Sequence, residues 1–189
     1  YWYYFQANGK ALTNGDNDKV SLKTINGKKY AFDDEGKMLY GWVDEDSAER
    51  VDDTDSDGFK EGVYYFGGED DGAMTTGWLQ LDITYDEATN DDYKYTAAAF
   101  NDDEDQTRWF YFKSNGKRAE GEKVTYKGKT YYFDTDGKML TGWVTTGDGT
   151  SSVNEATNYE DDHTFYCDET GARAVSYTHL RAHETSLHL

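Results

Sequence analysis

Aromatic residues alternate with other residues in short runs along the chain, and each run is followed by a polar turn that ends in glycine. The stretch "TYYFDTDGKMLTGW", which begins at Thr130, shows the full pattern, and "KYAFDDEGKMLYGW", which begins at Lys29, repeats it. Alternation predicts that Tyr131 and Phe133 lie on one face of a strand and Tyr132 on the other. A polar loop of three to five residues that ends in glycine is typical of a β-hairpin turn closed by a left-handed residue.

The pattern occurs six times, so the chain is a series of repeats. We expect hairpins near residues 2–12, 29–43, 63–79, 109–119, 130–144 and 164–174. Their turn glycines are Gly9, Gly36, Gly72, Gly116, Gly137 and Gly171. Because a single two-stranded hairpin is barely stable in water, each must bury its aromatic face against its neighbours. The sequence therefore predicts an all-β fold, a repetitive β-hairpin solenoid with acidic loop inserts.

The inserts follow the Gly-Trp dipeptides that close the second, third and fifth repeats. They span residues 44–62, 82–108 and 145–163 and are rich in Asp, Glu, Asn, Ser or Thr. The spacing of the turn glycines matches the first three repeats to the last three, as in a larger duplication. We expect one repeat region over residues 1–174.

Composition and charge narrow the classes of partner. Hydrophobic residues make up 36% of the chain and aromatic residues 16%, with 17 Tyr against 3 Met, which favours strands over helical bundles. The formal net charge of -19 repels phosphate backbones and anionic lipids, so we expect no nucleic acid and no membrane surface as partner. No apolar run approaches the roughly 18 residues of a membrane span. The chain begins inside an aromatic strand, so we expect a fragment of a longer protein with upstream or downstream domains.

The sequence offers few candidates for a catalytic or metal-binding site. Cys167 stands where the other repeats carry Phe, which predicts a small buried hydrophobe rather than a reactive thiol. "DDTDSDG", residues 52–58, resembles the start of a calcium loop, but Tyr64 stands where the bidentate Glu would be, so we favour a solvated acidic loop. "DTDG" at 134–137 indicates turn chemistry. No catalytic constellation is visible, and we expect no enzyme activity, no metal site and no cofactor.

Residues 175–189, "VSYTHLRAHETSLHL", lose the acidic bias and fit no repeat. His179 and His183 would share one face of a helix, which is a spacing that metal ligands use. The stretch closely resembles translated sequencing-adapter sequence, so we interpret it as a non-native tail.

"YYFDTDGKMLTGW", "YAFDDEGKMLYGW" and "YYFGGEDDGAMTTGW" resemble the cell-wall-binding repeats of Gram-positive surface proteins. That group includes choline-binding modules, the glucan-binding repeats of glucosyltransferases and the repeats of clostridial toxins. The resemblance covers most of residues 1–174 outside the inserts. It implies a β-hairpin solenoid that attaches to the choline of wall teichoic or lipoteichoic acid, or to glucan.

In choline-binding members of this family, cages form between consecutive hairpins from a Gly-Trp indole and the strand aromatics of the next hairpin. The resemblance therefore nominates Trp42 with Tyr64 and Tyr65, Trp78 with Trp109 and Tyr111, and Trp143 with Phe165 and Tyr166. Quaternary ammonium groups are attracted to Trp and Tyr ring faces by about 0.5 to 2 kcal/mol per contact. The Trp that opens a strand in the family is kept only at Trp2 and Trp109, which makes Trp78 with Trp109 the best candidate.

We interpret the chain as a non-catalytic, secreted module at the cell wall surface. It would attach a larger protein to choline-decorated teichoic acid or to a cell-wall polysaccharide such as glucan, through aromatic grooves. One alternative is a structural spacer or stalk in which every ring is core and the acidic inserts maintain solubility. Another is that the acidic inserts recognise a basic partner.

Overall fold

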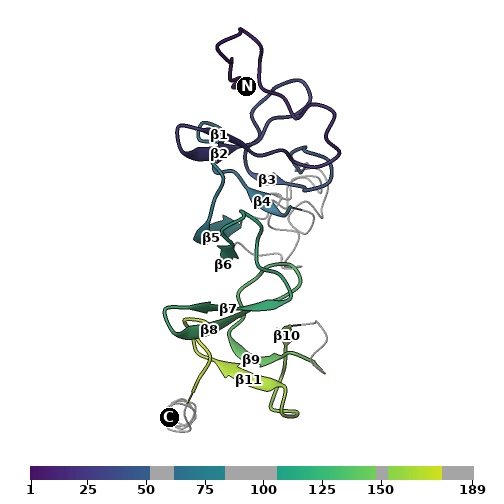
Figure 1. Ribbon diagram of the computed structural model, residues 1–189. Helices are drawn as coiled ribbons and strands as arrows, with labels where there is room; N and C mark the ends of the chain where they lie inside the picture. Colours follow the sequence, from purple (N-terminus) through teal and green to yellow (C-terminus); the bar gives the residue numbers. More distant parts are fainter. Residues whose placement is uncertain (52–61, 84–105, 148–152, 176–189) are drawn as a thin grey trace, which may run out of the picture. The chain divides into compact units, whose positions relative to one another are not determined.

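The computed structural model describes residues 1–51, 62–83, 106–147 and 153–175, and regular structure within them is entirely β (Figure 1). The strands are β1 Lys23–Ile25, β2 Lys28–Tyr30, β3 Trp42–Val43, β4 Tyr64–Tyr65, β5 Gly77–Ile83, β6 Gln106–Phe112, β7 Glu122–Tyr126, β8 Lys129–Phe133, β9 Gly142–Thr145, β10 Asn154–Glu155 and β11 Thr164–Cys167. The prediction of an all-β chain is confirmed.

The chain divides into an N-terminal unit, Tyr1–Arg118, and a C-terminal unit, Ala119–Leu189. The N-terminal unit contains the two-stranded sheets β1–β2, β3–β4 and β5–β6. The C-terminal unit contains β7–β8 and a three-stranded sheet in the order β10–β9–β11. All of these pairs are antiparallel (Figure 1).

The six predicted turn glycines all adopt the left-handed conformation, with φ between +63° and +86°. In most of the turns the glycine N–H donates to the carbonyl three residues earlier, as Gly137 does to Asp134 over 3.0 Å. The Asp134 carboxylate caps this turn by accepting from the N–H groups of Asp136 (3.0 Å) and Lys138 (2.9 Å). Burial raises the pKa of Asp134, while the bond from Lys138 opposes the shift. The prediction that "DTDG" is turn chemistry is confirmed.

The strand pairing differs from the hairpins that the sequence predicted. In most of the repeats, the segment that returns from the turn forms only a single bridge with the aromatic strand, as between Phe32 and Met38 or Phe133 and Met139. The longer ladders join the Gly-Trp segment of one repeat to the aromatic strand of the next, in β3–β4, β5–β6 and β9–β11. The sheets therefore link consecutive repeats, and the turns connect one sheet to another.

The sequence analysis did not predict two further hairpins, β1–β2 and β7–β8. Their two-residue loops are Asn26-Gly27 and Lys127-Gly128, and all four residues have positive φ, as a type I′ turn requires. The first strands, KTI and EKVTY, carry little of the aromatic alternation that marked the six repeats. The Asn-Gly dipeptide itself was the available signal.

Within each unit, a backbone hydrogen bond ties a repeat to the one before it. The residue two positions after a turn glycine donates its N–H to the carbonyl of the residue that opens the preceding repeat. The bonds run from Met38 to Trp2 (2.8 Å), from Met74 to Lys29 (2.8 Å), from Arg118 to Val63 (2.9 Å) and from Arg173 to Thr130 (2.8 Å). Nearest-neighbour contacts of this kind are typical of repeat proteins.

Methionine side chains pack directly beneath the turn glycine of the following repeat. A Cβ added at Gly72 would collide with the Met38 sulfur, and one at Gly116 would collide with the Met74 sulfur. Gly171 and Met139 repeat this contact in the C-terminal unit. Both the left-handed backbone conformation and the packing of the methionine therefore require glycine at these positions.

Gly116→Ala and Gly9→Ala separate these two effects. Both glycines are left-handed, at φ +86° and +77°, but nothing lies within 4 Å of a Cβ at Gly9. A left-handed residue with a Cβ costs roughly 1–2 kcal/mol, and overpacking adds about 1–3 kcal/mol. We expect Gly116→Ala to lower the free energy of unfolding by about 2–4 kcal/mol and Gly9→Ala by about 1 kcal/mol, measured by urea denaturation followed by circular dichroism. Equal losses would contradict packing at Gly116.

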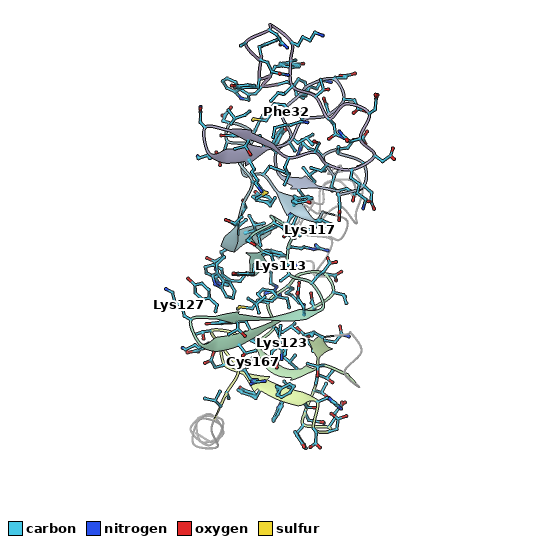
Figure 2. All side chains as sticks on the ribbon, viewed as in Figure 1. Phe32, Lys113, Lys117, Lys123, Lys127 and Cys167 are labelled. Atoms are coloured by element: carbon cyan, nitrogen blue, oxygen red, sulfur yellow. The ribbon has the colours of Figure 1, made fainter. Side chains whose placement is uncertain are left out.

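Three buried clusters form the core. Two lie in the N-terminal unit, around Trp42 and around Val43, and one lies in the C-terminal unit around Tyr132. Cys167 is fully buried in the third cluster, and Phe32 is also buried (Figure 2). Burial raises the pKa of the Cys167 thiol to about 12, so it stays neutral near pH 7. The prediction of a small buried hydrophobe at Cys167 is confirmed.

Candidate functional site

Each Gly-Trp indole lies against a tyrosine of the next repeat, because the antiparallel register places the two residues directly opposite each other. In all three cases the rings meet edge to face, an arrangement that aromatic pairs favour. Ring centroids are 5.3 Å apart for Trp42 with Tyr65, 5.2 Å for Trp78 with Tyr111 and 5.2 Å for Trp143 with Tyr166. The structure thus brings these predicted pairs together.

Trp42 belongs to the core rather than to a groove. Its side chain is only 1% exposed and packs against Phe110 and Phe112, with centroid distances of 5.4 Å and 5.6 Å. A Cβ at Gly62 would lie 2.8 Å from the Trp42 Cβ, so the backbone also covers the indole. Tyr64 is 5% exposed and belongs to the buried cluster around Val43. The expectation that Trp42 and Tyr64 line a groove does not fit this burial.

Trp78, Trp109 and Tyr111 lie together on β5 and β6. Trp109 is 40% exposed, and its ring centroid lies 6.2 Å from that of Trp78, at an angle of 82°. Trp78 and Tyr111 are half-buried. These three rings form an aromatic surface with one face open to solvent, so they remain a candidate for cation binding.

Trp143 pairs with Tyr166 but not with Phe165, the third residue nominated for its cage. Phe165 follows the strand alternation to the other face of β11 and stacks on Tyr132 at 5.6 Å and 13°. Tyr159, from the insert at 145–163, lies 6.3 Å from Trp143 instead. Tyr159 could not be predicted from the repeats, because this tyrosine lies outside the repeated motif.

A pocket that the sequence analysis missed lies between the first and second repeats. This Trp2 pocket has a volume of about 320 Å³, and Trp2, Tyr4, Tyr30 and Met38 line it together with the carboxylates of Asp70 and Asp71. Trp2 Nε1 donates to Asp70 Oδ1 over 3.2 Å. None of the described residues that line it is Lys, Arg or His. Ring faces beside carboxylates attract cations, including cations that carry no hydrogen-bond donor.

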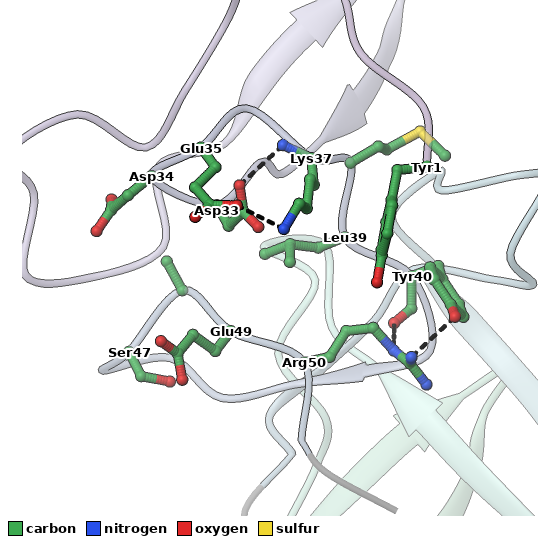
Figure 3. Close-up of a pocket in the computed structure, with 12 residues that line it drawn as sticks. Tyr1, Asp33, Asp34, Glu35, Lys37, Leu39, Tyr40, Ser47, Glu49 and Arg50 are labelled. Carbon is green, nitrogen blue, oxygen red and sulfur yellow. Dashed lines mark hydrogen bonds and ion pairs between the residues drawn. The ribbon is translucent and has the colours of Figure 1, made fainter.

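A second pocket in the N-terminal unit has a different chemistry (Figure 3). This Arg50 pocket has a volume of about 510 Å³, and its lining includes Tyr1, Tyr40, acidic residues and Lys37. The Arg50 guanidinium lies 3.8 Å from the Tyr40 ring centroid, and Arg50 donates to the Tyr40 carbonyl (3.1 Å) and hydroxyl (2.8 Å). Side chains of both charges and two phenol rings suit a ligand rich in hydroxyl groups better than a bare cation.

Neither a metal-binding cluster nor a membrane-spanning helix is found among the described residues. The acidic stretch 52–58 lies outside them. No group of three or more His, Cys, Asp or Glu within residues 1–51, 62–83, 106–147 and 153–175 could hold a metal ion. The same residues contain no helix long and apolar enough to cross a membrane.

Comparison with known families matches the repeats directly. Residues 124–152 match a family described as "Choline-binding repeat", and residues 1–11 and 105–117 match a "cell wall binding repeat". Glucosyltransferase-S of Streptococcus mutans is 30% identical over 152 residues, which is 74% of this chain and 8% of that protein. The chain thus corresponds to a small part of this relative.

Solved structures support the fold. Choline binding protein F from Streptococcus pneumoniae has a TM-score of 0.50 at 24% identity, covering 92% of this chain and 38% of that chain. A complex of the same protein with ipratropium gives a TM-score of 0.51 at 24% identity, covering 92% and 36%. The predicted β-hairpin solenoid is confirmed. The matched segments show that the chain carries cell-wall-binding repeats, and the similarity to the glucosyltransferase supports this.

Proposed function

We propose that this chain binds choline-bearing teichoic acid through aromatic surfaces between consecutive hairpins and so holds a larger secreted protein at the cell wall. The repeats form a cell-wall-binding module. The observation that carries the choice of ligand is the Trp2 pocket, where five aromatic residues and a methionine line a cavity together with two aspartates. We further propose that the chain itself performs no chemistry.

The lining of the Trp2 pocket suits a quaternary ammonium. Such a group cannot donate hydrogen bonds, so it gains little from polar walls but is attracted to the faces of Trp and Tyr rings. Asp70 and Asp71 add negative charge without a basic side chain among the lining residues. The Trp78, Trp109 and Tyr111 surface offers a second place of the same type.

A glucan is the second candidate ligand, favoured by the Arg50 pocket. Sugars stack their C–H faces on aromatic rings and bond their hydroxyls to charged side chains, and this pocket offers Tyr1 and Tyr40 beside Glu49 and Arg50. The similarity to a glucosyltransferase agrees with this alternative. The two ligands would use different pockets of the same unit.

Titration of choline chloride into the full chain at high salt tests the proposal. High salt screens the charge of -19, which would otherwise attract any cation. We expect a saturable change in tryptophan fluorescence with choline and with tetramethylammonium, and none with added sodium chloride. A flat response from the folded protein would exclude choline as the ligand. A response to a neutral dextran oligosaccharide would then favour glucan.

A further inference from the structure

We infer that the guanidinium of Arg173 occupies the aromatic pocket between the fifth and sixth repeats, so that an internal cation closes this pocket to ligand. The inference rests on the proposed function, because it concerns which junctions between repeats admit a cation. It follows from comparing this junction with the Trp2 pocket.

The two junctions use the same positions relative to the turn glycines. In the Trp2 pocket, two lining residues lie seven and five positions before the turn glycine of one repeat. Two more lie six positions before and two positions after the turn glycine of the following repeat. These are Trp2, Tyr4, Tyr30 and Met38 in the Trp2 pocket, and Thr130, Tyr132, Phe165 and Arg173 at the other junction. Arg173 therefore stands where the open pocket has Met38.

The backbone brings Met38 and Arg173 to the same place. Met38 donates its N–H to the Trp2 carbonyl, and Arg173 donates its N–H to the Thr130 carbonyl, both over 2.8 Å. The two side chains thus start from matching backbone positions. The difference between the junctions lies in the side chains.

The Arg173 guanidinium makes the contacts expected of a bound cation. Its Cζ lies 5.1 Å from the centroid of the Phe165 ring, and Nη1 donates to the Tyr132 hydroxyl over 3.1 Å. Phe165 and Tyr132 are themselves stacked at 5.6 Å. Guanidinium groups stack well on aromatic faces, so Arg173 itself supplies the cation that these two rings would otherwise take from a ligand.

Arg118 is a second arginine at this position of a repeat, and it lies against a different ring. It also stands two positions after its turn glycine, Gly116, and donates its N–H to the Val63 carbonyl over 2.9 Å. Its side chain is buried, and the guanidinium lies 5.9 Å from the Trp42 ring centroid. At both described junctions where Arg takes this position, it lies against an aromatic ring, whereas Met38 borders a cavity of about 320 Å³.

The test replaces Arg173 in the full chain and follows the ring signals of Phe165 and Tyr132 by NMR. Tetramethylammonium chloride is titrated into Arg173→Ala and into the unmodified chain, with sodium chloride at matched ionic strength as the control. We expect saturable shifts of both rings in Arg173→Ala and none in the unmodified chain. Equal shifts in the two proteins, or no shift in the folded variant, would overturn the inference.

Two further variants make the outcome decisive. Arg173→Met carries the residue found at position 38 and has the same expectations, so it replaces Arg173→Ala if that variant fails to fold. Met38→Arg is the reciprocal change, and we expect it to weaken tetramethylammonium binding at Trp2 at least tenfold. If Trp2 of the unmodified chain does not respond while the Arg173 variants do, the proposed function fails and the closed pocket stands.

Discussion

Replacing Trp42 with Ala is expected to lower the free energy of unfolding of the N-terminal unit by about 3–5 kcal/mol, the range for a buried Trp or Phe truncated to Ala. Trp42 is 1% exposed and contacts Tyr65, Phe110 and Phe112. The surrounding rings come from β4 and β6, so the cavity left by the indole would weaken contacts between two sheets. Urea denaturation followed by circular dichroism measures the loss.

Trp109→Ala is the matched control for this change. The same atoms are removed, but Trp109 is 40% exposed, and its ring centroid lies 6.2 Å from that of Trp78. We expect a loss of about 1 kcal/mol, the ordinary size for a partly exposed position. A Trp42→Ala variant as stable as Trp109→Ala would contradict the assignment of Trp42 to the core.

The double variant Trp2→Ala, Trp109→Ala is expected to lose at least about tenfold in apparent affinity for choline-bearing cell walls, while its fold is retained. Each lost ring contact with a quaternary ammonium is worth about 0.5–2 kcal/mol, and about 1.4 kcal/mol corresponds to a factor of ten. Trp2 is 57% exposed, so its removal opens no core cavity. Sedimentation with purified walls at high salt measures the affinity.

Phe5→Ala provides the control for the double variant. Phe5 is 64% exposed and does not line the Trp2 pocket, although it belongs to the same repeat. We expect wall binding by Phe5→Ala to match that of the unmodified chain. A loss as large as that of the double variant would indicate that general exposed hydrophobicity, and not the pocket, drives binding.

The turns could be predicted from the sequence because they depend on local chemistry. A glycine at the end of a polar loop is needed wherever the backbone must be left-handed, and all six predicted glycines are. The pairing of Trp78 with Tyr111 was also predictable, since the family motif fixes which strand follows each Gly-Trp. Both inferences use residues whose relation the repeat itself defines.

The Trp2 pocket could not be predicted in this way because it joins residues that are distant in the sequence. Trp2 bonds Asp70 across 68 positions, and Met38 reaches the pocket from the next repeat. The burial of Trp42 likewise depends on Phe110 and Phe112, which lie beyond two inserts. An identical Gly-Trp motif therefore produces a core residue at Trp42 and a half-buried residue at Trp78.

Competition by free choline in the wall-sedimentation assay tests the central claim most directly. The unmodified chain is bound to choline-bearing walls at high salt, and choline chloride, sodium chloride or a dextran oligosaccharide is added. We expect choline to release the chain while equal concentrations of sodium chloride and dextran do not. Binding that resists choline but is released by dextran, or that is absent at high salt altogether, would contradict recognition of teichoic-acid choline by the aromatic pockets.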